Sequence, residues 1–148
     1  MASPSVVRRA RADDLPRVIE IERACFGRDA YPRNLFADYL RECGELFLVS
    51  TAETGVTGYI IACFQKNRAE LVSIAISPGA RHSGIGSALL RSAFRRLRIR
   101  SVERIYLMVH VENSAAVAFY GKHAFRRTGR IREYYGPGRD AWRMSRLL

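Results

Sequence analysis

The sequence predicts an α/β fold of the α+β kind, in which a mixed, mostly antiparallel sheet of about seven strands is flanked by about four helices. Two observations predict it. Apolar runs of strand length alternate along the chain with stretches in which apolar residues recur at helical spacing. Near the middle, an apolar run, a turn with two glycines, a helical stretch and a second apolar run follow one another. This order is typical of a right-handed parallel crossover.

The same patterns place the elements along the chain. Runs rich in Val, Ile, Leu and aromatic residues predict strands at 6–8, 46–49, 58–64, 70–76, 105–111, 124–132 and 142–147. Helical spacing predicts helices at 15–26, 34–40, 87–94 and 115–120. Asp13 or Asp14 can cap the first helix, and Gly27 ends it. The residues of this helix that follow the helical spacing are Leu15, Val18, Ile19, Glu22, Cys25 and Phe26.

Length and composition indicate one globular domain over residues 1–148. No apolar run reaches the roughly 18 residues of a membrane span. Residues 1–5 lack the apolar core of a signal peptide. Cys25, Cys43 and Cys63 are odd in number and lack Cys-x-x-Cys spacing, so the sequence favours three buried thiols over a disulfide or a metal site. We therefore expect a cytoplasmic protein with no membrane partner.

The chain is strongly basic, with a formal net charge of +11 at pH 7. One stretch holds six arginines, namely Arg91, Arg95, Arg96, Arg98, Arg100 and Arg104. A solvated helix face explains such a stretch, and so does a surface that attracts polyanions such as RNA, ribosomes or acidic proteins. The charge therefore admits nucleic acid as a nonspecific partner without identifying one.

The turn between the two central apolar runs has features of a phosphate-binding loop. Gly84 and Gly86 let the backbone approach an anion closely. The first N–H groups of the helix that follows have no partner within the helix, and the helix dipole adds partial positive charge there. A helix start that only needs room explains the same two glycines.

Two motifs resemble the GNAT N-acetyltransferase superfamily. Ser73–Leu90, with Arg-x-x-Gly-x-Gly at its centre, resembles the superfamily's loop for the acetyl-CoA pyrophosphate, and Asn113–Tyr120 resembles its second signature. Leu107–Tyr120 and Arg132–Tyr135 look closest to the RimI-like branch, whose members acetylate protein N-termini, including that of a ribosomal protein. The resemblance implies the GNAT fold and direct transfer of an acetyl group from acetyl-CoA to a primary amine in a ternary complex.

The resemblance also implies a cofactor site for acetyl-CoA and no metal. The backbone of Ile74, Ala75 and Ile76 would hydrogen-bond the acetyl and pantetheine groups, and an N–H there could donate to the thioester oxygen. Asn113 would reach the pantetheine arm, and it is equally suited to be a helix N-cap. The pyrophosphate would be held by the charge of Arg81 and the backbone of His82, Ser83, Gly84, Ile85, Gly86 and Ser87.

Tyr120 matches the superfamily's catalytic acid. A phenol with a pKa of about 10 can give a proton to a departing thiolate while staying neutral at neutral pH. A core aromatic residue with a satisfied hydroxyl explains the same position.

The general base does not carry over from the RimI-like enzymes. Where they have Glu or His, this chain has Met108, which cannot accept a proton. Glu70 is the preferred replacement, because the resemblance places it where the histone-acetylating members of the superfamily keep their glutamate base. It also alternates with Val72 and Ile74 on one face of the predicted strand, so its carboxylate could point toward the cleft. His110 and Glu112 are the other candidates, and a water chain or no dedicated base stays open.

The acceptor side is the least defined by the sequence. Phe26 and Tyr31 could line an acceptor groove or belong to the core. Tyr134 and Tyr135 match a tyrosine pair that grips the peptide backbone in N-terminal acetyltransferases, and two tyrosines packed in a hairpin explain them as well. The leading hypothesis is acetylation of a protein N-terminal amine, with a ribosomal acceptor among the candidates. A small-amine acetyltransferase and a non-catalytic acyl-CoA-binding module that docks on RNA or the ribosome are the alternatives, and the oligomeric state is not indicated.

Overall fold

The computed structural model describes residues 5–148. Its strands are β1 (Val6–Arg9), β2 (Phe47–Ala52), β3 (Gly55–Gln65), β4 (Arg68–Ile76), β5 (Arg104–His110), β6 (Arg126–Ile131) and β7 (Ala141–Leu147). Its α-helices are α1 (Leu15–Phe26), α2 (Asn34–Glu42), α3 (Ile85–Ile99) and α4 (Ser114–Lys122). Residues 1–4, which enter the prediction that the chain has no signal peptide, lie outside the described residues.

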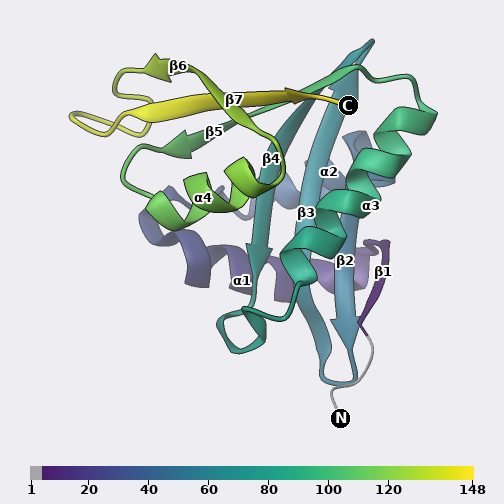
Figure 1. Cartoon of the computed structure of the whole chain (residues 1–148). Helices are drawn as coiled ribbons and strands as arrows, with labels where there is room; N and C mark the ends of the chain where they lie inside the picture. The colour runs from purple at the N-terminus through teal and green to yellow at the C-terminus, as the bar shows by residue number, and fades with distance from the viewer. Residues whose placement is uncertain (1–4) are drawn as a thin grey trace.

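All the strands form one sheet, in the order β1-β2-β3-β4-β5-β7-β6. Neighbouring strands are antiparallel except for β4 and β5, which are parallel. Helix α3 connects these two strands and packs across the sheet (Figure 1). The predicted mixed, mostly antiparallel sheet with four flanking helices is confirmed.

Helices cover both faces of the sheet, α1 and α2 behind it and α3 and α4 in front of it in Figure 1. Two groups of buried apolar side chains fill the space between them. The first, which we call the α3 core, includes Leu89, Leu90 and Leu97 of α3 with Ile60 and Leu107 of the sheet. The second, the α1 core, includes Val18, Ile21 and Phe36 of the two rear helices with Tyr59 and Ile61 of the sheet. The sheet is therefore the middle layer of three.

A β-bulge interrupts β4 at Val72. Ile61 of β3 lies opposite Ser73, but the next residue, Ala62, lies opposite Leu71. Val72 is therefore an extra residue on β4 that has no counterpart on β3. Such an insertion bends the strand and shifts the alternation of its side chains by one position.

The bulge corrects one prediction about this strand. Glu70, Val72 and Ile74 do not share one face, because the alternation of a regular strand fails at the extra residue. Leu71 belongs to the α3 core, so Glu70 beside it points to the opposite face, where Val72 packs against the α1 core. Ile74 packs against the α3 core instead. The expectation for Glu70 and Val72 holds, and that for Ile74 is wrong.

The expectation of three free thiols is also wrong. Cys43, just after α2, and Cys63 of β3 form a disulfide, with their Cα atoms 5.0 Å apart. Cys25 is the free cysteine of the described residues. The fold brings the end of α2 onto β3, a contact that a spacing of 20 residues does not reveal.

Between residues 5 and 148, the structure contains no helix that is both long enough and apolar enough to span a membrane.

The disulfide is testable by counting thiols. Before reduction, the denatured protein is expected to react at Cys25 alone, and after reduction at all three cysteines. Because the disulfide closes a loop of 20 residues, reduction is expected to lower the free energy of unfolding by about 3 kcal/mol. Three reactive thiols in the unreduced, denatured chain would contradict the pairing.

Candidate active site

The site lies where β4 and β5 separate. Their parallel pairing ends at Glu70 and Tyr106, although both strands continue beyond these residues. Among residues 5–148, the β5-facing edge of β4 beyond Glu70 therefore has no strand partner. This edge includes Ile74–Ile76, the predicted contacts for acetyl and pantetheine groups. Free backbone N–H and C=O groups along a strand edge can bind an extended ligand as an added strand would bind.

The N-terminus of α3 lies directly after this edge. Gly84 is the N-cap residue in the left-handed conformation, with a φ of 80°. The helical hydrogen bonds begin with the N–H of Ala88, which donates to the Gly84 oxygen at 3.0 Å. The N–H groups of Ile85–Ser87 come before that first bond and have no acceptor within the helix. They form a cradle for an anion at the positive end of a helix of 15 residues.

Gly86 has a second role that the sequence did not indicate. A Cβ atom on Gly86 would lie 3.1 Å from Cζ of Phe119 in α4. This is closer than side chains normally pack, so glycine here lets α3 and α4 meet at the start of α3. The absence of a side chain therefore serves the packing of the two helices as well as any approach of an anion.

The other predicted pyrophosphate residues lie around this cradle. His82 and Ser83 are exposed in the turn, where His82 has a φ of 65° and the Ser83 hydroxyl donates to the Ala80 oxygen at 2.5 Å. The Ser87 hydroxyl is 2.9 Å from Nε2 of His123.

Arg81 is also exposed, and its guanidinium lies next to α1. Nη2 of Arg81 donates to Sγ of Cys25 at 3.3 Å. That thiol in turn donates to the backbone oxygen of Ile76 at 3.4 Å. The Cys25 thiol thus links the guanidinium of Arg81 to the end of β4.

Helix α4 supplies Asn113 and Tyr120. Oδ1 of Asn113 accepts the N–H of Ala116 at 3.1 Å, so Asn113 is the N-cap of α4, and its amide nitrogen remains able to donate to a ligand. Tyr120 is buried among Phe119 and Phe125. Burial, and after it the proximity of Tyr135, raises the pKa of Tyr120 above its ordinary value. The phenol therefore stays protonated at neutral pH.

On the opposite face of the sheet, Glu70 lies beside Tyr106. The Tyr106 hydroxyl donates to Oε2 of Glu70 at 3.2 Å, and the two residues are register partners on β4 and β5. Tyr106, Met108 and His110 alternate with buried residues of the α3 core, so they share the face that Glu70 uses. Sequence reasoning missed Tyr106. Its spacing of two from Met108 was the available signal.

The negative charge of Glu70 also acts on the pKa of three tyrosines. Burial comes first among the causes that raise the pKa of Tyr31, Tyr39 and Tyr134, and the charge of Glu70 contributes to each. Tyr31 lies in the loop between α1 and α2, and Tyr134 lies in the turn between β6 and β7. Tyr31 packs against the α1 core and Tyr135 stacks on His110, so the two loops, far apart in the chain, lie on the face that carries Glu70.

The remaining predicted residues lie on this face or at its edge. Tyr135 stacks on His110, with ring centroids 5.2 Å apart, and burial raises the pKa of Tyr135 to about 12. Nδ1 of His110 accepts the N–H of the exposed Glu112 at 3.1 Å. Phe26 packs against the α1 core, which supports its core interpretation.

An ion pair joins the two loops. Nη1 of Arg139, before β7, donates to Oδ1 of Asp29 at 2.9 Å, and Nη2 donates to Oδ2. The hydrogen bonds from Arg139 hold the pKa of Asp29 below its usual range. The two residues are 110 positions apart, and nothing in the sequence pairs them.

Glu22, a buried residue of α1, holds the α1–α2 loop by a hydrogen bond to its backbone. It is 1% exposed, and its carboxylate accepts the N–H of Tyr31 at 3.0 Å, the hydroxyl of Ser73 at 2.7 Å and the hydroxyl of Tyr59. A buried carboxylate requires such partners. In the sequence, Glu22 occupies a position in the apolar stripe of the first helix, and this was the signal that could have indicated its buried role.

Among residues 5–148, no group of three or more His, Cys, Asp or Glu side chains is arranged to hold a metal ion. The fold and the site define a transferase-like arrangement with two sides. An anion cradle and an open strand edge lie beside α3, and a carboxylate lies beneath two joined loops on the other face.

Comparison with known proteins agrees with this arrangement. The acetyltransferase (GNAT) family model matches residues 15–125. An N-alpha-acetyltransferase of Saccharolobus solfataricus is 32% identical over 155 aligned residues, covering 96% of this chain and 92% of the relative. A ribosomal protein bS18-alanine N-acetyltransferase of Salmonella typhimurium is 28% identical, covering 82% of this chain and 81% of the relative.

Solved structures show the same similarity. Ard1 from Thermoplasma volcanium matches with a TM-score of 0.92 and 27% identity over 97% of each chain. The ribosomal-protein-S18-alanine N-acetyltransferase from Escherichia coli matches with a TM-score of 0.84 and 25% identity over 98% of this chain and 94% of that one. The chain belongs to the acetyltransferase (GNAT) family and is an N-acetyltransferase. The predicted resemblance, including that to the RimI-like enzymes, is confirmed.

The Asp29–Arg139 pair gives a prediction with a defined pH dependence. Because the folded-state pKa of Asp29 is lowered from 3.8, the stability that the pair adds is present above that ordinary value and is lost as pH falls through the folded-state pKa. Wild type is therefore expected to be more stable than Asp29→Asn at about pH 7, and the difference is expected to shrink toward about pH 2. Urea unfolding at both pH values measures it.

The matched control is Asp38→Asn, which breaks an exposed ion pair with Arg41 within α2 and is expected to change stability little. Asp29→Asn is also expected to raise KM for a peptide acceptor several-fold while KM for acetyl-CoA stays unchanged. An equal rise in both KM values would show that the pair does not act on the acceptor side.

Proposed function

We propose that this enzyme transfers the acetyl group of acetyl-CoA to the N-terminal α-amine of a protein. The observation that carries the proposal is that the loops of Tyr31 and Tyr134, joined by an ion pair, lie on the face of the sheet that carries Glu70. A carboxylate on this face can accept a proton from an amine, and the two loops can contact the peptide chain that continues from it. The names of two relatives support this choice, one an archaeal N-alpha-acetyltransferase and the other a bacterial ribosomal protein bS18-alanine N-acetyltransferase.

Acetyl-CoA, when bound, supplies an activated acyl thioester. The N–H groups of Ile85–Ser87 and the guanidinium of Arg81 would hold its pyrophosphate, and the free edge of β4 at Ile74–Ile76 would hold its pantetheine arm by hydrogen bonds. Asn113 would donate its amide N–H to the same arm. The strand edge and the cradle fit such a molecule because they follow one another from the split in the sheet to the N-terminus of α3.

Tyr120 would act as the general acid. Its raised pKa keeps the phenol protonated, so it can donate a hydrogen bond and then a proton to the sulfur atom that leaves.

Glu70 would accept the proton from the incoming amine, directly or through a water molecule. The bulge at Val72 supports this role, because it leaves Glu70 on the face toward which both loops converge. His110 is the second candidate, since it shares that face, but its ring is stacked on Tyr135 and its Nδ1 already accepts a hydrogen bond. Met108 lies between Tyr106 and His110 on this face and supplies no basic atom.

A panel of acceptors tests the proposal. Thiol release from acetyl-CoA is measured with peptides that carry a free α-amine, the same peptides blocked at that amine but carrying a free lysine, and a small polyamine. The N-terminal sequence of ribosomal protein S18 is one of the peptides. Turnover confined to free α-amines supports the proposal. Turnover of the polyamine alone would contradict it and favour the small-amine alternative.

Tyr120→Phe is expected to lower kcat by about 100-fold, because it removes the acid and keeps the ring. The melting temperature is expected to change little, since the variant keeps the buried ring and its contacts with Phe119 and Phe125. Steady-state kinetics and thermal unfolding measure the two effects. Tyr39→Phe, a tyrosine on the acceptor side, is the matched control and is expected to keep kcat within a few-fold.

Glu70→Gln is expected to lower kcat by about 100-fold at neutral pH and to recover partly as the pH rises, because more of the amine is then already deprotonated. The pH profile of kcat/KM measures this. Unchanged turnover in Glu70→Gln, together with loss in His110→Gln, would move the general base to His110.

A further inference from the structure

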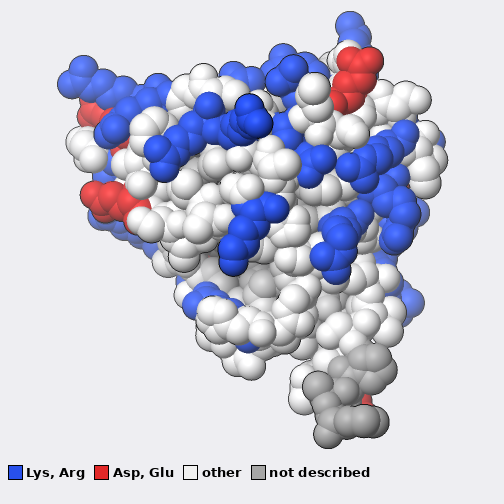
Figure 2. Space-filling model, in the orientation of Figure 1, with Lys and Arg blue, Asp and Glu red and all other residues white. Residues whose placement is uncertain are grey.

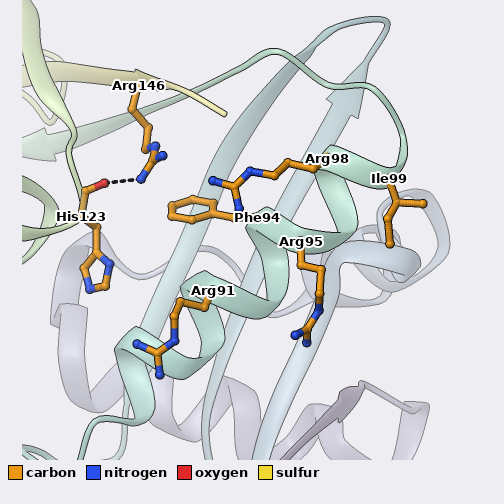
Figure 3. Close-up of a pocket in the computed structure, with 7 residues that line it drawn as sticks. All are labelled: Arg91, Phe94, Arg95, Arg98, Ile99, His123 and Arg146. Carbon is orange, nitrogen blue, oxygen red and sulfur yellow. Dashed lines mark hydrogen bonds between the residues drawn. The ribbon is translucent and has the colours of Figure 1, made fainter.

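A groove with a basic lining lies on the outer side of α3, away from the acceptor face. It has a volume of about 650 Å³ and runs between α3, the loop after α4 and β7. Figure 3 shows that Arg91, Arg95 and Arg98 project from α3, while Arg146 comes from β7. In Figure 2, Lys and Arg side chains gather on this face, and acidic side chains lie mainly at its margins. The proposed acetyl transfer does not use these arginines.

Within the part of the chain that the structure describes, no carboxylate side chain lines the groove. Among residues 5–148, none of these four arginines forms a salt bridge with Asp or Glu, although arginines elsewhere in the chain do. The positive charge of Arg91, Arg95 and Arg146 is therefore not neutralised by an acidic side chain, while Arg98 contacts the oxygen of Leu148, the last residue of the sequence.

Two of the arginines are held in place. Nη1 of Arg146 donates to the His123 oxygen at 2.7 Å, and Nε of Arg98 donates to the Leu148 oxygen at 3.2 Å. Both guanidinium groups lie near the ring of Phe94, at 4.7 Å and 5.9 Å from its centroid (Figure 3). Because backbone oxygens and the ring fix their positions, little side-chain freedom remains to be lost when a ligand binds.

The positive charges that line the groove repel one another. Burial, followed by the charge of Arg98, lowers the pKa of Arg146. Burial, followed by the charges of Arg91 and Arg146, lowers the pKa of His123. An anion in the groove would relieve this repulsion, so the groove favours a ligand with several negative charges.

The residue type and spacing favour phosphate groups. Guanidinium groups bind phosphate oxygens in a bidentate manner, more selectively than lysines do. Arg91, Arg95 and Arg98 recur every three or four positions, so they form a row along α3 with a rise of about 6 Å per step of four residues. Phe94 is 3% exposed and offers no ring on which an unpaired base could stack.

We propose that this groove binds the phosphodiester backbone of a double-stranded nucleic acid without reading its sequence. Four arginines would contact successive phosphates, and the acceptor loops on the other face of the sheet would stay free. The chemistry is shared by RNA and DNA duplexes, and the experiment separates the two.

Binding is measured by fluorescence anisotropy with a labelled RNA duplex and a labelled DNA duplex, each of about 20 base pairs and of the same sequence. A labelled polyglutamate peptide of similar charge is the third probe. Wild type is expected to bind at least one duplex, with an affinity for DNA that falls roughly 100-fold between 50 and 200 mM salt if four phosphates are neutralised. Tighter binding of the RNA duplex would assign the groove to RNA, and equal binding would assign it to the shared backbone.

The variant Arg95→Gln/Arg98→Gln is expected to weaken duplex binding at least 10-fold and to lower the salt slope by about 2. Its matched control is Arg23→Gln/Arg33→Gln, which removes the same charge from exposed positions on α1 and just before α2, on the other face. Unchanged thermal unfolding and an unchanged KM for acetyl-CoA would show that the groove variant is folded.

Three results would overturn the proposal. One is equal loss of binding in the control variant, which would show that net charge alone attracts the duplex. Another is competition by saturating CoA, which would assign the groove to the cosubstrate. The third is binding of polyglutamate as tight as that of either duplex, which would assign it to acidic protein surfaces.

Discussion

At Val72 the strand β4 carries one residue more than β3 opposite it, and both sides of the active site depend on that insertion. Pairing between β4 and β5 stops at Glu70, just before the extra residue, so the strand edge beyond it is free for a ligand. The same insertion keeps Glu70 on the α1 side and turns Ile74 to the α3 side. One local irregularity therefore separates the place where the cofactor would lie from the face where the acceptor would lie.

On the acceptor side, charged side chains hold two loops in position. Glu22 is buried and ties the loop of Tyr31 to β3 and to Ser73 of β4. Asp29 and Arg139 then join that loop to the β6–β7 turn. Loops are the mobile parts of a fold, so a site built on two of them needs such fixed points to hold its side chains in position. The tyrosines depend on these carboxylates for their placement.

Local patterns predicted most of the fold, including the two-glycine turn and Asn113 as a helix N-cap, because spacing and turn chemistry act within a few residues. They did not predict the bulge, since its position depends on the register between β3 and β4. Nor did they predict the pairs Cys43–Cys63 and Asp29–Arg139, which exist only once distant segments meet. The single domain, the cytoplasmic location and the absence of a metal stay predictions.

The most direct test is a crystal structure of the enzyme with a conjugate in which CoA is joined through an acetyl link to the N-terminus of a peptide. The account predicts that the peptide nitrogen lies on the face of Glu70, within one bridging water of its carboxylate, with the peptide running between the loops of Tyr31 and Tyr134. A peptide that enters from the α3 side, or a nitrogen placed beside His110 and away from Glu70, would contradict it.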